Sequence, residues 1–439
     1  MSDTVELRIF MLKDVLVVGG RAREHALQWK LSGDTEVGRV YCAPGNGGTQ
    51  HNVPISETDI EGLARFAKEN NLFTVVGPEL PIAMGIANHF WAEGLGICAP
   101  TREAARLETS KAWCKEFLAG RGIPTPQFKV FDDPEMAKEH VRSVDYKVVV
   151  KADGLCEGKG VIVCDSAAEA EEAIERLMVR REFGDAGAKV VIEKRLYGEE
   201  RSFMAISDGT RIEAFASSRD YKKLQDNDEG PNTGGMGAYS PAPAGPETER
   251  QMYDIAWKIV TGMRDEGFPF VGFIYVGFMI VGGKPQVLEI NSRLGDPETE
   301  TLVRRMDSPL FPYIEAAAHS SLDETVRRRG AIRWKNWSAV TVVLASKGYP
   351  DRDYARGEAV TFRPMDGMAY IFHAGTKKVG GGIVTDGGRN FAVTALGRDL
   401  EYAAYNAYEA VESIRYPSKI LRRDIARNVT PAEALQSKA

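Results

Sequence analysis

The chain carries the stretch Lys147-Val-Val-Val-Lys-Ala-Asp-Gly-Leu-Cys-Glu-Gly-Lys-Gly-Val-Ile-Val-Cys164, which decides how its fold is interpreted. Two runs of valine and isoleucine, residues 148–150 and 161–163, are typical of buried strands. The glycines between them let backbone N–H groups approach an anion, and Lys151 and Lys159 add positive charge. A Walker P-loop would continue into a helix, with Ser or Thr after its lysine. Here Gly160 follows instead. The stretch therefore predicts a β-hairpin that covers phosphate groups, although an isolated glycine-rich hairpin would carry no such role.

The composition indicates an ordinary soluble globular protein of about two to four domains. The chain has 439 residues, of which 43% are hydrophobic and 27% charged, and its formal charge is −6. This charge argues against a nucleic-acid partner. No apolar stretch is long enough to span a membrane, and the N-terminus lacks a signal-peptide pattern. The five cysteines show no CxxC spacing, which favours reduced thiols. We therefore expect a cytoplasmic protein that uses small molecules and binds neither nucleic acid nor membrane.

The first hundred residues predict a parallel α/β domain. Apolar strands are expected near residues 14–18, 40–43, 73–76 and 96–98, with helical patterns between them. Ligands of such sheets bind at the carboxyl ends of the strands, where Asn46 and Glu79 lie. The dinucleotide motif GxGxxG is absent because Arg21 and Ala22 stand where glycines would be needed. A hydride-transfer enzyme is therefore a weak candidate.

The remainder of the chain predicts antiparallel sheets and one long loop. Strands are expected at residues 202–206, 273–281 and 285–290, and a small α/β domain with a helix near 399–414 is expected from residue 331 onward. Residues 220–243 combine glycine, proline and acids, which predicts an irregular segment of functional importance. Asp220 or Asp228 in it could bind a cationic amine. The alternative is a mobile surface loop.

Glu289, Asn291 and Arg293 are spaced two residues apart, so they point from one face of a predicted strand. Carboxylate and amide oxygens are suitable ligands for magnesium, and the arginine could neutralise an anion. A solvated polar face on an edge strand explains the triplet equally well. The turn that follows could bring Asp296 and Glu298 to the same place.

Taken together, these segments resemble the ATP-grasp ligases, and within them the glycinamide ribonucleotide synthetase family. The resemblance covers about residues 12–425, and most of it is carried by residues 151–155, 158–161, 289–293 and 295–299. The most specific part is the block Gly230-Pro-Asn-Thr-Gly-Gly-Met-Gly-Ala-Tyr-Ser-Pro-Ala-Pro243, because ATP-grasp proteins in general lack it.

The resemblance implies a multidomain fold of mixed α/β and α+β class. After an extension at 1–11, it implies an N-terminal parallel α/β domain at 12–112, an ATP-grasp lid at 113–197, a central domain at 198–330 and a small C-terminal domain at 331–439. It implies a ligase that joins glycine to 5-phosphoribosylamine through a glycyl phosphate and releases ADP and phosphate. The expected cofactors are ATP and Mg²⁺ or Mn²⁺, and the expected assembly is a monomer or weak homodimer.

The resemblance also assigns roles to individual residues. For ATP it implies Lys111, Lys151, Gly158, Lys159, Gly160, Glu193, Leu196 and Glu200. For the metal it implies Glu289 and Asn291. For the substrates it implies Asn46, Glu79, Asp220, Asn232, Thr233, Gly234, Gly235, Arg293, Gly295 and Asp296. The catalytic roles fall to Arg293, Lys159 and Asp220.

The chain departs from the family pattern at several positions. Arg21 replaces a glycine of the first turn, Cys156-Glu157 replaces small residues of the hairpin, Lys223 stands where arginine is common, and Glu300 stands where glutamine is frequent. Arg21 is the main feature in favour of a second hypothesis, an ATP-grasp ligase that uses another amine or acid. A third hypothesis, a nucleotide-binding protein without catalysis, would require loss of the metal ligands or of the hairpin lysines, and all are present.

Overall fold

The computed structural model describes residues 12–156, 159–365 and 367–427. Its N-terminal domain confirms the predicted parallel sheet, with strand order β2-β1-β3-β4. The strands are β1 (Lys13–Gly19), β2 (Val37–Pro44), β3 (Phe73–Val76) and β4 (Ile97–Cys98). The helices between them are α1 (Ala22–Ser32), α2 (Ile60–Glu69), α3 (Glu79–Ala83) and α4 (Ile86–Ala92). The loops after β1, β2 and β3 therefore lie at one edge of the sheet, as ligand-binding loops do in this architecture.

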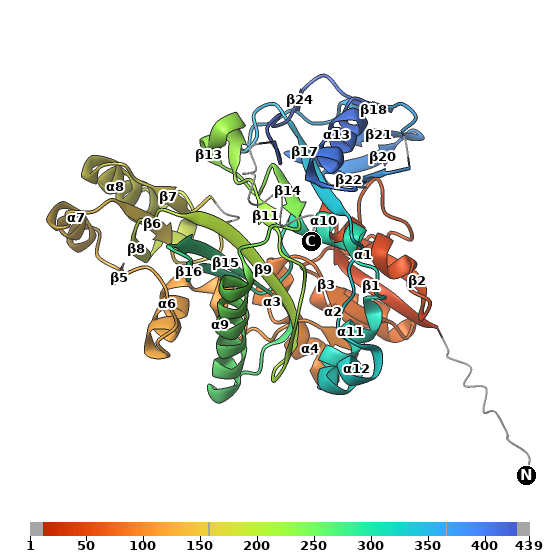
Figure 1. Cartoon of the computed structure of the whole chain (residues 1–439), viewed down its shortest axis with the longest axis horizontal. Coiled ribbons are helices and arrows are strands. Elements are labelled where there is room, and N and C mark those ends of the chain that lie inside the picture. Colours follow the sequence, from red (N-terminus) through yellow and green to blue (C-terminus); the bar gives the residue numbers. More distant parts are fainter. Residues whose placement is uncertain (1–11, 157–158, 366, 428–439) are drawn as a thin grey trace, which may run out of the picture.

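The lid is a four-stranded sheet with two helices, and it projects from the rest of the molecule at the left of Figure 1. Its order is β5-β8-β6-β7, formed by β5 (Phe128–Phe131), β6 (Val148–Ala152), β7 (Val161–Val163) and β8 (Val190–Lys194). The predicted hairpin is confirmed, since β6 and β7 pair antiparallel. Helices α7 (Pro134–Ser143) and α8 (Ala167–Ile174) pack on this sheet around Val150, Leu177 and Ile192. Because this apolar cluster contains lid residues alone, the lid has a core of its own.

The central domain is an antiparallel sheet covered on both faces. Its order is β10-β9-β15-β16, from β9 (Glu199–Asp208), β10 (Ile212–Ala214), β15 (Val271–Val281) and β16 (Lys284–Asn291), which confirms the strands predicted there. Side chains alternate along β15: Ile274 packs against α9 (Pro246–Asp265), whereas Phe273 packs in a cluster with α11 (Phe311–Ala318). That second cluster also contains Phe73 of β3, so the N-terminal and central domains share one core.

The C-terminal domain is built on a sheet that begins much earlier in the chain. The order is β11-β14-β17-β22-β19, with β24 (Lys419–Ile420) also paired to β17. The late strands are β17 (Ser338–Ser346), β19 (Ala369–His373) and β22 (Arg389–Gly397), and α13 (Leu400–Val411) packs on them. A second sheet has the order β20-β21-β18-β23, from β18 (Ala359–Phe362), β20 (Thr376–Val379), β21 (Gly382–Thr385) and β23 (Ile414–Arg415).

The prediction of an irregular segment at 220–243 is wrong in part. The segment contains the end of β11 (Arg219–Asp220) and the strands β12 (Lys223–Gln225), β13 (Glu229–Asn232) and β14 (Gly237–Ser240). Strand β14 pairs with β17, and a Cβ atom at Gly237 would lie 2.7 Å from the carbonyl oxygen of Thr341. The glycine that suggested a loop is therefore needed for close packing of two strands. Strands of this segment therefore share a sheet with strands that lie beyond residue 330, where the sequence suggests a domain boundary.

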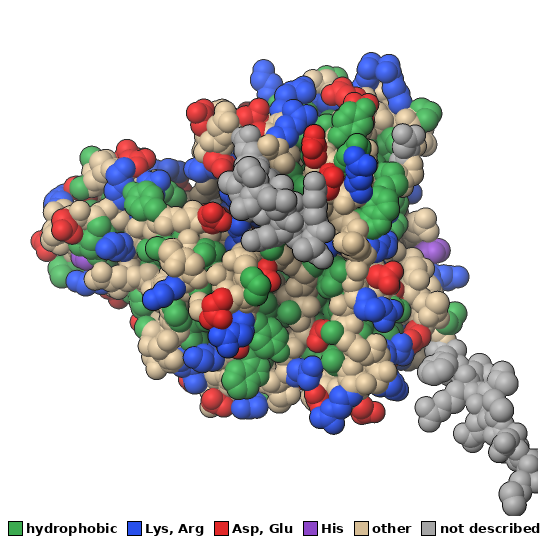
Figure 2. Space-filling view, in the orientation of Figure 1, with side chains coloured by type: hydrophobic (Ala, Val, Ile, Leu, Met, Phe, Trp, Pro, Cys, Tyr) green, Lys and Arg blue, Asp and Glu red, His purple; other side chains and the backbone are tan. Residues whose placement is uncertain are grey.

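Helix α10 (Glu298–Arg305) lies at the centre of the molecule and packs against α1, β14, β17 and β22 (Figure 1). On the face shown in Figure 2, acidic and basic side chains are interspersed, in keeping with the modest net charge. Among the residues that the structure describes, no helix is both long and apolar enough to cross a bilayer.

Glu300 on α10 is a buried carboxyl group, and within the described residues neither of its oxygens has a hydrogen-bond partner. Burial and the nearby Asp296 raise the pKa of Glu300 well above its ordinary value, against the opposing effects of Arg389 and Arg23. The folded protein therefore keeps this proton at pH values where the unfolded chain releases it. The contribution of Glu300 to stability becomes less favourable as pH rises above the ordinary carboxyl pKa.

Replacing Glu300 by Gln removes this titration while it preserves the size of the side chain. We expect Glu300→Gln to match the parent protein near pH 4 and to exceed it by about 1–3 kcal/mol in unfolding free energy near pH 8. Thermal unfolding followed by circular dichroism at several pH values measures the difference. The exposed Glu401→Gln serves as a control that should show no such trend. A constant difference between Glu300→Gln and the parent at all pH values would contradict the assignment.

Candidate active site

A cavity opens where the lid, the central sheet, the N-terminal strand ends and β22 meet. It collects most of the residues that the sequence analysis assigned to a site: Glu79, Lys111, Lys151, Gly160, Glu193, Asp220, Asn232, Thr233, Gly234, Glu289, Asn291, Arg293, Gly295 and Asp296. The predicted residues outside its lining are Asn46, Lys159, Leu196, Glu200 and Gly235. Gly158 lies outside the described residues, as do Glu157 and the predicted extension 1–11.

Glu193 on β8 is fully buried between two lysines. Its Oε1 atom lies 2.8 Å from Nζ of Lys151 on β6 and 3.1 Å from Nζ of Lys115 on α6 (Lys111–Gly120). Burial alone would raise the pKa of Glu193, but the two ammonium groups lower it. Burial lowers the pKa of Lys115 to about 8, although Glu193 opposes the shift. The predicted contact of Glu193 with adenine or ribose stays a prediction, and what the structure shows is a carboxylate that orients Lys151.

Lys111 begins α6 directly after the residue that caps this helix. Ser110 accepts a hydrogen bond from the backbone N–H of Trp113 and donates one to Asp153 at the end of β6. The ammonium group of Lys111 donates to the carbonyl of Gly154 at 2.9 Å. The start of α6 is thus tied to the base of the lid hairpin, which places two lysines, Lys111 and Lys151, along one side of the cavity.

Glu289 and Asn291 face the cavity from the end of β16. Opposite Glu289 on β15 stands Gly277, where a Cβ atom would lie 3.1 Å from Cγ of Glu289, so the absence of a side chain makes room for the carboxylate. Oε1 of Glu289 forms an ion pair with Nζ of Lys222 at 2.8 Å. This lysine lowers the pKa of Glu289 to about 2, against the effect of burial. The carboxylate is therefore ionised throughout the physiological range.

Arg293, the third residue of the Glu289–Asn291–Arg293 triplet, lies just beyond the end of β16. Its guanidinium group forms ion pairs with two carboxylates. Its Nε atom lies 3.4 Å from Glu79, and its Nη2 atom lies 3.4 Å from Glu108. Glu108 is held in turn by Ser292, whose backbone N–H and hydroxyl both donate to it. Burial would raise the pKa of Glu79, but Arg293 and Arg23 lower it to about 2. The predicted substrate residue Glu79 and the predicted catalytic residue Arg293 are thus brought into contact.

Asp220 lies in the cavity near several other acids. Burial raises the pKa of Asp220 to about 8; Lys222 opposes the shift, whereas Glu298, Glu200 and Glu289 increase it. A carboxyl group in this state exchanges a proton close to neutral pH, so it can either donate or accept one during a reaction.

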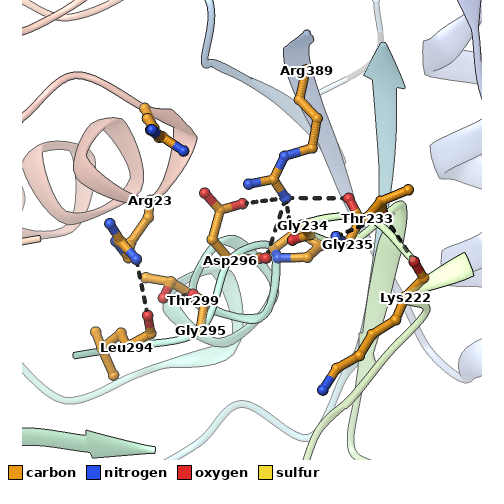
Figure 3. Close-up of polar contacts among 12 residues, drawn as sticks. Arg23, Lys222, Thr233, Gly234, Gly235, Leu294, Gly295, Asp296, Thr299 and Arg389 are labelled. Atoms are coloured by element: carbon orange, nitrogen blue, oxygen red, sulfur yellow. Dashed lines mark hydrogen bonds and ion pairs between the residues drawn. The ribbon is translucent and has the colours of Figure 1, made fainter. Parts of the chain in front are cut away.

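Arg389 on β22 joins the loop of Gly234 to the loop of Asp296, as Figure 3 shows. Its Nη1 atom donates to the carbonyl of Gly234 at 2.6 Å and to that of Gly235 at 3.2 Å, and it lies 3.0 Å from Oδ1 of Asp296. Gly235 therefore holds Arg389 although it does not line the cavity.

Sequence reasoning missed the site residues Lys115, Lys222 and Arg389. Lys222 could have been suspected because it lies in the segment of residues 220–243, among several acids. Nothing near Lys115 or Arg389 in the sequence indicates a partner, because their contacts are with residues far away along the chain. The side-chain amide of Asn46 donates to the carbonyls of Gly20 and His373 and so holds the loop after β2 in place, and its predicted substrate contact stays a prediction.

Comparison with known proteins identifies the family of the chain. Three family models match in succession: phosphoribosylglycinamide synthetase N domain at residues 13–108, its ATP-grasp (A) domain at 109–299 and its C domain at 339–428. The chain belongs to the phosphoribosylglycinamide synthetase family. The phosphoribosylamine–glycine ligase of Vibrio vulnificus (strain YJ016) is 44% identical over 424 residues, which cover 94% of this chain and 97% of that one.

Solved structures show the same relationship. A phosphoribosylamine–glycine ligase from Thermotoga maritima has a TM-score of 0.80 and 33% identity, with 94% of this chain and 100% of that chain covered. The biotin carboxylase domain of 2-oxoglutarate carboxylase from Hydrogenobacter thermophilus has a TM-score of 0.68 and 16% identity over 93% of this chain and 92% of that one. At this identity the second likeness concerns the fold alone. The multidomain fold expected from the sequence is confirmed.

The Lys115–Glu193–Lys151 cluster predicts a large effect of one substitution. Glu193→Gln leaves two buried ammonium groups without a counter-charge, so we expect a loss of about 3–5 kcal/mol in unfolding free energy. Urea unfolding at neutral pH measures it. The double variant Glu193→Gln/Lys115→Met should recover part of the loss, because one uncompensated charge is then removed. If Glu193→Gln were as stable as the parent, the cluster would not hold these elements together.

Proposed function

We propose that the chain is a phosphoribosylamine–glycine ligase of purine biosynthesis, which joins glycine to 5-phosphoribosylamine and converts ATP to ADP and phosphate. The proposal is supported by family models that together match most of the chain and by nearly full-length relatives of that name. In chemical terms the chain is an ATP-dependent ligase that forms a carbon–nitrogen bond.

The observation that carries the proposal is the content of the cavity. Two lysines for phosphate groups, Lys111 and Lys151, share it with the oxygen ligands Glu289 and Asn291 and with Arg293. The family-specific segment 230–243 reaches the same cavity through Asn232, Thr233 and Gly234. A nucleotide-binding protein without catalysis would not need the arginine and the second substrate loop together in one place.

The reaction must first activate a carboxylate, which is a poor acyl donor. Transfer of the terminal phosphoryl group of ATP to glycine gives a glycyl phosphate, and the amine then displaces phosphate from it. Phosphoryl transfer demands positioning and charge neutralisation rather than covalent work by the protein. Lys151, held by Glu193, meets the phosphates, and Arg293 stabilises the negative charge that moves to the acyl phosphate.

The amine step releases a proton as the amide bond forms. We assign this role to Asp220, because it lines the same cavity and its raised pKa makes its ionised form a stronger base than an ordinary carboxylate. A glycyl phosphate also hydrolyses in water, so the site must be closed before the amine attacks. The lid supplies that closure, with Lys159 and Gly160 on its hairpin placed over the phosphates.

Glu289 and Asn291 fit Mg²⁺ or Mn²⁺ by the chemistry of their donor atoms. Both offer hard oxygen ligands, and Mg²⁺ commonly takes one or two protein ligands and completes its shell with water and phosphate oxygens. Within the described residues there is no group of three or more His, Cys, Asp or Glu that could hold a metal, so a largely nucleotide-borne ion suits the site. When bound, the ion neutralises phosphate oxygens. The biotin carboxylase neighbour is described as a complex with MgADP.

We also propose a cytoplasmic location and a monomer or weak homodimer. All five cysteines are buried, and buried thiols suit a reducing compartment. Both substrates of the proposed reaction are small molecules, and no nucleic-acid partner is proposed.

Omission of single components tests the reaction. With ATP, Mg²⁺, glycine and freshly prepared 5-phosphoribosylamine, we expect ADP release that requires both glycine and the ribosylamine. A coupled assay for ADP measures it. ADP release that requires glycine but not the ribosylamine would show that the amine substrate is a different compound. An absence of release while ATP still binds would contradict ligation itself.

Arg293→Lys tests the role of the arginine. A lysine retains the charge but cannot reach Glu79 and Glu108 and still present a planar donor to the moving phosphoryl group. We expect kcat to fall about 10²–10³-fold, the usual loss for one charge-stabilising donor, with little change in KM for ATP. Arg304→Lys is the matched control, since this partly buried arginine does not line the cavity. If the two substitutions lowered kcat equally, Arg293 would have no specific role in phosphoryl transfer.

A further inference from the structure

Lys222 occupies an unusual place relative to the proposed metal ligands. Its Nζ atom lies 2.8 Å from Oε1 of Glu289, within hydrogen-bond distance, and both side chains are one-third exposed towards the cavity. A carboxylate oxygen in this contact cannot at the same time bind a divalent cation at full strength. The ammonium group would also repel a doubly charged ion placed a few ångströms away.

The backbone of Lys222 is fixed, whereas its side chain extends into the cavity. The carbonyl of Lys222 accepts two hydrogen bonds from Thr233, one from the backbone N–H at 2.7 Å and one from the hydroxyl at 2.9 Å. Figure 3 shows the anchored backbone and the side chain that leads away from Thr233. The ammonium group can therefore leave Glu289 by rotation of the side chain alone, with no change in the strands around it.

A second carboxyl group, that of Asp220, lies near Lys222, and an approaching ammonium group favours the ionised form of this acid. Asp220 lies two residues before Lys222, lines the same cavity and interacts with it electrostatically. A lysine stem with four carbons can move between two acids of one cavity at small cost, which a shorter or planar side chain could not do. The charge would stay in the cavity after the exchange.

We propose that Lys222 is an internal competitor of the divalent cation: its ammonium group neutralises Glu289 until the cation displaces it. The inference rests on the proposed metal-binding role of Glu289 and Asn291. It makes Lys222 a positioning residue that holds a partly exposed carboxylate in place, and that lowers metal affinity as a consequence. Thr233 anchors the backbone of Lys222, and Arg389 binds the carbonyl of the next residue, Gly234, so the exchange takes place on a fixed segment.

Metal binding tests the inference without a measurement of turnover. The protein is saturated with ADP, and Mn²⁺ is titrated while the enhancement of water proton relaxation is recorded. We expect Lys222→Met and Lys222→Gln to bind Mn²⁺ about three- to fivefold more tightly than the parent, as the loss of a partly exposed competing ion pair allows. Lys222→Arg, which keeps a competing cation, should stay within about twofold of the parent.

Lys223→Met is the matched control, since it removes the same charge one residue further along, where no side-chain contact with Glu289 is found among the described residues. It should leave Mn²⁺ affinity unchanged. If Lys222→Met and Lys222→Gln bind Mn²⁺ as the parent does, or more weakly, the competition is refuted. An equal gain in Lys223→Met would also refute it, because general electrostatics would then suffice.

Glu289→Gln separates this inference from the proposed function. The loss of Mn²⁺ binding in Glu289→Gln shows that the signal reports on the intended ligand, and the Lys222 variants then decide the competition by themselves. Unchanged Mn²⁺ binding in Glu289→Gln would overturn the metal assignment and the competition together. Circular dichroism spectra that match the parent ensure that each variant is compared in its folded state.

Discussion

The cavity depends on the pairing of charges that are removed from water. Glu193 sits between Lys115 and Lys151, and Arg293 sits between Glu79 and Glu108, so each buried charge has a partner on another element. Such pairs contribute little net stability when complete, but the loss of one partner is severe. The arrangement therefore fixes where α6, the lid strands and β16 stand relative to each other. A charged substrate that enters the cavity can then replace one partner of an existing ion pair, so no side-chain charge is left unpaired before it binds.

Patterns local in sequence predicted the fold and much of the site. The valine runs around Lys151 gave the hairpin, and the period of two from Glu289 to Arg293 placed three polar groups towards one cavity. Both inferences needed only the alternation of strand side chains and the phosphate-binding tendency of glycine and lysine. The resemblance added the identity of the substrates, which no spacing argument could supply.

What could not be predicted depends on contacts between distant parts of the chain. Arg389 is 155 residues from Gly234 along the chain, and the local sequence around neither residue predicts their hydrogen bond. The resemblance assigned Glu193 to ATP, but nothing near it in the sequence indicates the two lysines with which it forms buried ion pairs. The segment 220–243 looked irregular because glycine and proline usually break strands; Gly237 instead lets β14 approach β17 closely.

The passage of β11 and β14 into the C-terminal sheet has a consequence for how the chain can be divided. A fragment that began at residue 331 would contain β17 without its neighbour β14, and one long edge of that strand would lie open. Open edges of this kind pair with other chains and promote aggregation. Conversely, a fragment that ended at residue 330 would leave β14 without its sheet. The last hundred residues are therefore no separable module, and they must be synthesised before the segment 219–240 can complete its fold.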